Sequence, residues 1–206
     1  MRYFGFKRLM PYILTPDEAD ADILITSHAH FDHFDVDSVP RLMSCEKTVL
    51  FAANDVKEEC GRLHIPEERV TYLSVGERQE ADGIEIFALP CDHGELAPDA
   101  LGLLLKIDGK KIYFTGDTAF RQDLFANPAV KGCDLLIVPI NGAFGNMNES
   151  EAQEAASIIA PKRVVPCHFW NFAEHGGNPG LFAQSMDANA PHIPYSILPV
   201  GGEILI

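Results

Sequence analysis

The chain has 206 residues, of which 47% are hydrophobic, and its 30 acidic side chains outnumber the 16 lysines and arginines to give a net charge of −14. This length allows one well-buried core, and an acidic surface repels nucleic-acid phosphates, so we expect a single domain, residues 1–206, without a nucleic-acid partner. No run of about 18 apolar residues indicates a membrane span, and the five cysteines form no C-x-x-C pair, which favours a cytoplasmic location.

Short apolar runs predict strands along the first half of the chain. The first run, DILITS at residues 22–27, leads directly into HAHFDH, a segment crowded with metal-binding side-chain types. Further strands are expected at residues 48–53, 69–74 and 83–89. Residues 54–64 have a helical pattern in which Asn54 occupies the N-cap position.

A hairpin over residues 101–117 is the clearest local prediction, because two apolar runs flank Asp108-Gly109, a dipeptide suited to a tight turn with positive φ. Beyond it, strands are expected at residues 133–140, 163–169, 195–200 and 203–206, and helices at residues 148–160 and 178–190. Asn148 and Glu151 have the spacing of a capping box. These elements indicate an α/β (α+β sandwich) fold whose sheets carry helices on their outer faces.

Four of the predicted strands lead into side chains that bind metal ions in proteins. In chain order these side chains are His28, His30, Asp32 and His33, then His93, Asp117 and His168. In an extended backbone His28 and His30 point the same way, so both can hold one cation. If the chain then turns, Asp32 and His33 can face a neighbouring cation. Imidazole and carboxylate ligands suit Zn²⁺, Mn²⁺ or Fe²⁺.

The motif H-x-H-x-D-H, followed by a separate histidine, an aspartate in TGDT and a last histidine, resembles the metallo-β-lactamase superfamily. Within it the chain is most similar to the L-ascorbate-6-phosphate lactonase-like group, through residues 8–36, 65–90, 109–120 and 159–170. The resemblance implies a four-layer αββα fold. Only 27 residues precede His28, so we expect the family's first strands to be missing and a neighbouring subunit to cover the exposed sheet edge in a homo-oligomer.

The resemblance also implies two divalent ions, zinc or manganese, and assigns their ligands. His28, His30 and His93 would hold one ion, Asp32, His33 and His168 the other, and Asp117 would bridge both. A hydroxide between the ions would attack the substrate, with Asp32 orienting it and moving its proton. The implied substrate is a small ester or lactone. A phosphorylated sugar-acid lactone is the narrower candidate within this class.

Several other residues leave two interpretations open. His175 either donates to the substrate or leaving group, which makes it the second catalytic candidate beside Asp32, or is an ordinary loop histidine. Asn141, Asn146 and Asn148 either bind substrate or form turns, and we favour turns. We expect Trp170 to pack in the core, His64 and His192 to be structural or exposed, and Cys91 and Cys167 to be small buried residues. Asp22 or Asp35 could orient a ligand histidine, although helix capping by Asp35 or Asp37 is the simpler interpretation.

Three functions remain open on these observations. The first is the metal-dependent hydrolysis of an ester or lactone. The second is phosphodiester hydrolysis by the same metal set, against which the acidic surface argues where nucleic acid is concerned. The third is a non-catalytic protein that binds metal and a metabolite.

Overall fold

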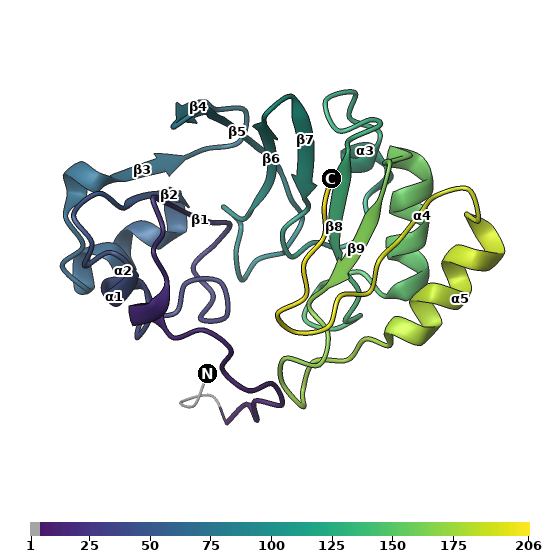
Figure 1. Ribbon diagram of the computed structural model, residues 1–206, viewed down its shortest axis with the longest axis horizontal. Helices are drawn as coiled ribbons and strands as arrows, with labels where there is room; N and C mark the ends of the chain where they lie inside the picture. The colour runs from purple at the N-terminus through teal and green to yellow at the C-terminus, as the bar shows by residue number, and fades with distance from the viewer. Residues whose placement is uncertain (1–4) are drawn as a thin grey trace.

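The computed structural model describes residues 5–206 and consists of two β-sheets packed face to face, with helices on both outer faces (Figure 1). The smaller sheet is parallel, in the order β1 (Ile23–Thr26), β2 (Val49–Ala53), β3 (Val70–Leu73). The larger sheet follows chain order, with β4 (Arg78–Ala81), β5 (Ile84–Pro90), β6 (Leu101–Ile107), β7 (Lys110–Phe114), β8 (Leu135–Pro139) and β9 (Val164–Cys167). Pairs from β4 to β7 are antiparallel, whereas β7–β8 and β8–β9 are parallel.

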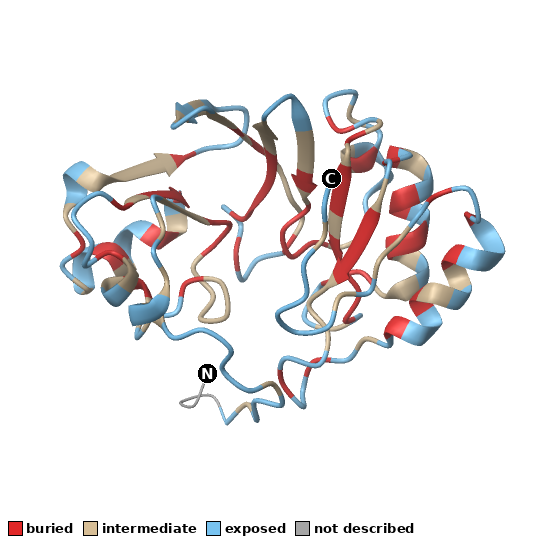
Figure 2. Ribbon diagram, in the orientation of Figure 1, coloured by how far each residue is buried: buried red, intermediate tan, exposed pale blue. Residues whose placement is uncertain are grey.

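Three apolar clusters hold these layers together. Between the sheets lie residues of β2, β3, β5 and β6, among them Phe51, Leu73, Ile86, Leu101 and Leu103. Helices α1 (Val39–Leu42) and α2 (Lys57–Arg62) cover the smaller sheet, and α3 (Gln122–Phe125), α4 (Glu149–Ile159) and α5 (Pro179–Asn189) lie beside the larger one. Figure 2 shows buried residues along the central strands and the inner face of α4. The predicted αββα layering is confirmed.

The β6–β7 hairpin forms as the sequence predicts. Asp108 and Gly109 have φ angles of 49° and 76°, and Ile107 pairs with Lys110 across the turn. Positive φ at both central positions matches the right-handed twist of the flanking strands, which is why Asp-Gly favours this connection. The hairpin carries β7 back towards the site, where Asp117 follows its end.

Other local predictions were wrong. Residues 195–200 and 203–206 do not form strands. Tyr195 makes an isolated bridge to Val164. Pro199 then follows, and proline has no N–H with which to continue the pairing. The helix predicted within residues 54–64 is present as α2, preceded by a 3₁₀ turn (Asn54–Val56), but its predicted N-cap was wrong. Asn54 does not cap this helix, because its side chain donates to the Leu73 carbonyl and to Ser74 Oγ.

The sequence analysis gave no residue range for three four-residue elements: α1, α3 and the edge strand β4. In β4 only alternate residues are partly buried, because this strand lies at the end of the larger sheet. Among residues 5–206, no helix is long and apolar enough to cross a membrane.

Asn148 caps α4 as predicted. Its side chain accepts hydrogen bonds from the backbone N–H groups of Ser150 and Glu151, both at 3.0 Å, and the Glu151 carboxylate accepts from the Asn148 N–H at 2.9 Å. We predict that Asn148→Ala lowers the free energy of unfolding by about 1 kcal/mol, measured by urea denaturation. Asn148→Asp retains an acceptor and should lose much less; equal losses in both variants would contradict the capping role.

Candidate metal centre

The loop that follows β1 presents four of the predicted ligands, and hydrogen bonds hold its shape. The backbone N–H groups of His33 and Phe34 both donate to the His30 carbonyl, at 2.8 and 2.7 Å, which turns the chain sharply. Thr26 Oγ1 donates to the His33 carbonyl at 2.9 Å. The Ser27 carbonyl accepts from the Leu101 N–H at 2.9 Å, which ties this loop to the start of β6 in the other sheet.

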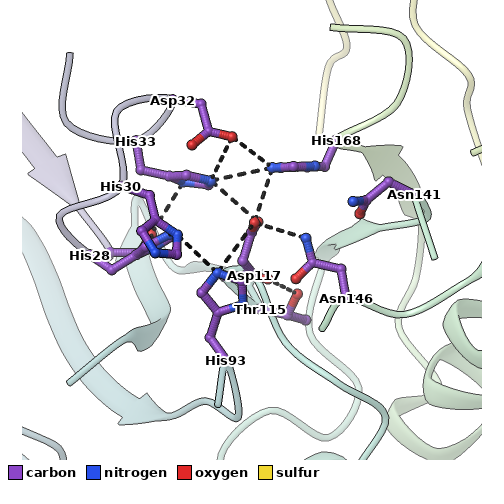
Figure 3. A network of polar contacts seen from close by, with 12 residues as sticks. His28, His30, Asp32, His33, His93, Thr115, Asp117, Asn141, Asn146 and His168 are labelled. Atoms are coloured by element: carbon purple, nitrogen blue, oxygen red, sulfur yellow. Dashed lines mark hydrogen bonds and ion pairs between the residues drawn. The ribbon is translucent and has the colours of Figure 1, made fainter. Parts of the chain in front are cut away.

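One group of ring nitrogens gathers at His30 (Figure 3). His28 Nε2 and His93 Nε2 lie 3.0 and 3.1 Å from His30 Nδ1. One ligand atom from each of these three histidines falls within 4.8 Å of the others. His28 and His93 are almost inaccessible to solvent, and His30 is partly exposed. The loop after β1 and the end of β5 therefore present three imidazoles to one point.

The second predicted group also converges. His168 Nε2 lies 3.2 Å from Asp32 Oδ2 and 3.4 Å from His33 Nε2, and His33 Nε2 lies 3.8 Å from Asp32 Oδ2. His168 follows β9 in the left-handed region, with φ of 58°, a strained conformation that aims its ring at the loop from the opposite sheet.

Asp117 connects the two groups. Its Oδ1 lies 3.3 Å from His33 Nε2, and its Oδ2 lies 3.0 Å from His168 Nε2 and 3.9 Å from His93 Nε2. The preceding Gly116 has φ of 69°, and a Cβ there would approach the Leu101 carbonyl to 2.5 Å, so only glycine fits this turn. The seven side chains singled out as metal ligands thus form one cluster, in which Asp117 lies beside imidazoles of both groups.

Burial and mutual contact shift the pKa values of this cluster strongly. Burial and the neighbouring His33 lower the pKa of His28 to about 2, so its ring is neutral. Burial opposes a charge on His168, but the carboxylates of Asp117 and Asp32 outweigh it and raise the pKa of His168 to about 10. Burial likewise opposes ionisation of Asp32 and Asp117, yet hydrogen bonds from His168 lower the pKa of both, to about 2 for Asp32.

This donor set fits divalent cations. Two nitrogens bound to the same zinc ion, each at about 2.0–2.1 Å, are about 3.4 Å apart in tetrahedral geometry, close to the separations between these rings. Neutral imidazoles and ionised carboxylates are the ligand forms such ions require. The Nδ1 atoms of His93 and His168 are buried without a partner among the described residues.

His175 is the sixth histidine at the site. It is buried, and its ring stacks on His168 at a centroid distance of 4.6 Å and an angle of 18°. A ligand atom of His175 lies within 4.8 Å of those of Asp32 and His168. The interpretation as an ordinary exposed loop histidine was therefore wrong. The Gly-rich sequence around it gave no sign of this burial.

Sequence reasoning missed two residues that hold the cluster. Asn146, interpreted as a turn former, donates from Nδ2 to Asp117 Oδ2 at 2.8 Å and is buried. Asp55, not considered, accepts from the Ala29 N–H at 3.1 Å, between two of the histidines. Each of these contacts joins residues more than 25 positions apart in the chain. Neither Asn146 nor Asp55 lies in a local sequence pattern that would predict its partner.

The structure also tests the expectations for an asparagine, the aspartates near the first helix and the tryptophan. Asn141 is buried and donates from Nδ2 to the Ala143 carbonyl, but it does not lie in a turn. Neither Asp35 nor Asp37 caps α1, because the N-cap residue of this helix is Ser38; Asp35 instead accepts from Ser38 Oγ. Asp22 pairs with Lys47 and not with a histidine. Trp170 is 48% exposed, so the prediction of core packing was wrong.

The predictions for His64 and His192 were right, whereas the prediction that Cys91 and Cys167 are buried was wrong. His64 and His192 are exposed, as expected. Cys91 and Cys167 are only partly buried; Cys91 Sγ lies 2.9 Å from the Asp117 carbonyl, so it faces the site's backbone. All five cysteines are free.

Comparison with known proteins agrees with this geometry. Residues 3–169 match the family profile described as a beta-lactamase superfamily domain. A UPF0173 metal-dependent hydrolase of Carboxydothermus hydrogenoformans is 30% identical over 164 residues, which cover 76% of this chain and 70% of that protein. A second, of Saccharolobus solfataricus, is 30% identical over 163 residues, covering 78% and 71%.

Solved structures share the fold. Igni18, described as a novel metallo hydrolase from the archaeon Ignicoccus hospitalis, superposes with a TM-score of 0.74 at 21% identity, covering 90% of this chain and 78% of that one. Four-layer architecture and a cluster of histidines and aspartates at the strand ends define a metallo-β-lactamase fold protein. The chain belongs to this superfamily and, within it, to the UPF0173 metal-dependent hydrolase family.

The raised pKa of His168 predicts how stability depends on pH in the metal-free protein. The contacts of His168 with Asp32 and Asp117 contribute fully below its unfolded pKa of 6.5 and are lost as pH rises through about 10. We predict that the thermal midpoint of metal-free protein, relative to that of His168→Gln, falls between about pH 7 and about pH 10. Because groups elsewhere in the chain titrate in both proteins, their contribution drops out of the difference between the two thermal midpoints. A difference between the two proteins that does not change with pH would contradict the prediction.

Proposed function

We propose that this protein hydrolyses a small ester or lactone at a centre of two divalent metal ions, zinc or manganese. The proposed ligands are His28, His30 and His93 for one ion, Asp32, His33 and His168 for the other, and Asp117 for both. The position of Asp117 carries the proposal, because one carboxylate contacts imidazoles of both groups. The proposed unit is one metallo-hydrolase domain, residues 1–206.

The chain's own side chains would divide the remaining work. Divalent ions held by these ligands would lower the pKa of water from about 15.7 to about 7 and would polarise the carbonyl under attack. Asp32, whose carboxylate is 15% exposed and faces the pocket, orients the attacking water and takes up its proton. Asn146 holds Asp117 Oδ2 in a fixed direction.

His175 is the proposed proton donor for the leaving group. It lines the pocket above the ligand cluster together with Asp32 and His168. Burial, followed by the neighbouring His168, lowers the pKa of His175, so its ring is neutral near pH 7. To protonate the leaving group, it would first take up the proton that Asp32 receives from the attacking water. Its stacking on His168 fixes the plane of the ring relative to the centre.

If the substrate is a phosphorylated sugar-acid lactone, its phosphate needs a positively charged side chain near the metal pocket. A larger cavity of about 880 Å³ adjoins the metal pocket, and both are lined by Phe6, Phe31 and Asp32. Arg8 lines this cavity and has no carboxylate partner among the described residues, whereas Arg41 pairs with Asp17. Arg8 is therefore the side chain that such a phosphate would use.

Phosphodiester hydrolysis is the main alternative, because the same ligand set serves phosphoryl transfer equally well. A net charge of −14 disfavours nucleic acid as its substrate. A non-catalytic binding protein is the third candidate; all seven ligand-type side chains are retained at the site, which favours catalysis over binding alone.

Replacing Asp117 tests the proposed function directly. We predict that Asp117→Ala, assayed after loading with zinc or manganese, loses hydrolysis of ester and lactone substrates almost completely. Asp123→Ala makes the same chemical change on the exposed helix α3 and should retain full activity. An Asp117→Ala variant as fast as the wild type would show that the two-metal mechanism is wrong, and faster cleavage of a chromogenic phosphodiester than of esters would favour the alternative.

Measuring both metal content and kcat distinguishes the proposed role of His175 from metal binding. We predict that His175→Gln binds the same number of metal ions as the wild type but lowers kcat by about 10²–10⁴-fold, the usual contribution of general acid–base catalysis. The loss should shrink for esters with good leaving groups, which need no proton. Equal losses for good and poor leaving groups would contradict a proton-donating role.

A further inference from the structure

The pocket above the ligand cluster has a volume of about 300 Å³ and an apolar wall. Apart from His175 and the proposed metal ligands, its lining consists of Phe6, Phe31, Leu96 and Phe144. Among the described residues, no lysine, arginine, serine, threonine, asparagine or glutamine lines it. A volume at the small end of ligand pockets indicates a small ligand.

Two of these apolar side chains are exposed to solvent. Leu96 is 83% exposed and Phe144 is 53% exposed, so core packing does not explain either. Phe144 also has φ of 55°, a left-handed conformation that bulky residues rarely adopt. Strain of this kind at a site suggests a functional role. The ring of Phe144 lies 5.6 Å from that of His175, between centroids.

Phe6 closes the wall from another part of the chain. The segment that carries it pairs with the loop after β9, since the Leu9 N–H donates to the Asn171 carbonyl at 2.9 Å and the Ala173 N–H to the Lys7 carbonyl at 2.8 Å. The Phe6 ring lies 5.7 Å from Phe144 and 6.0 Å from His175. Segments far apart in sequence therefore build one apolar surface beside the metal ligands.

Resting on the proposed hydrolase function, we propose that the substrate is an aliphatic or aryl ester or lactone whose apolar group lies against Phe6, Leu96 and Phe144. A sugar hydroxyl placed there would give up its hydrogen bonds to water without replacement. An apolar group would gain the burial that these exposed side chains offer. In the reaction, water gives its oxygen to the acyl carbon, the acyl C–O bond breaks, and the leaving oxygen receives a proton.

The test compares p-nitrophenyl acetate with p-nitrophenyl hexanoate, and glucono-δ-lactone with an alkyl-substituted lactone, on metal-loaded protein. We expect kcat/KM to favour hexanoate over acetate by about tenfold or more, mainly through KM, since even one methylene in a fitting pocket is worth about tenfold. Leu96→Ala and Phe144→Ala should each reduce this preference several-fold. Leu181→Ala, which removes a 50% exposed leucine on α5, should leave it unchanged.

Calorimetric binding of the products, hexanoate and acetate, gives a readout independent of turnover. Hexanoate should bind more tightly than acetate to wild-type protein, and Phe144→Ala should remove the difference. Turnover without any preference for the apolar member of each pair, or preference for the sugar lactone, would overturn the apolar substrate class and leave the hydrolase function intact. No turnover, with hexanoate still bound selectively, would overturn the hydrolase function and support the apolar pocket. Neither turnover nor selective binding would overturn both.

Discussion

The Asp117 carboxylate, buried between imidazoles that come from both sheets, is the constraint on which the site depends. A buried ionised carboxylate is costly unless opposite charge or hydrogen bonds compensate for it. Asn146 supplies one hydrogen bond, and His168, protonated in the metal-free protein, supplies positive charge. Divalent cations would replace that proton with a larger charge. Once that proton is replaced, the carboxylates are anionic and the imidazoles neutral, which are the forms that bind divalent cations.

The sandwich brings these ligands together because strands from both sheets end at the same edge of the molecule. The loop after β1 supplies ligands from the smaller sheet, and β5, β7 and β9 supply the others from the larger sheet. The hydrogen bond between Ser27 and Leu101 joins the sheets beside the site. The segment around Phe6 and other loops add the apolar wall. The ligand-type side chains therefore follow strand ends closely, whereas the wall comes from segments farther from the strands.

Spacing made the main layers, and the convergence of the seven ligand-type side chains, predictable from the sequence. HAHFDH follows an apolar run, and Asp-Gly dictates one hairpin, so both patterns are local. Asn146 and Asp55 were not predictable in this way, because their partners Asp117 and Ala29 are distant in sequence. Trp170 and the last predicted strands failed because apolar character alone does not determine burial or pairing. The homo-oligomer, the cytoplasmic location and the absence of a nucleic-acid partner stay predictions.

Anomalous diffraction from crystals grown with zinc tests the central claim most directly, because it locates each bound ion. The account predicts two peaks per chain, one among His28, His30 and His93 and the other among Asp32, His33 and His168, with Asp117 in reach of both. A single peak, or ions bound only outside this cluster, would contradict it.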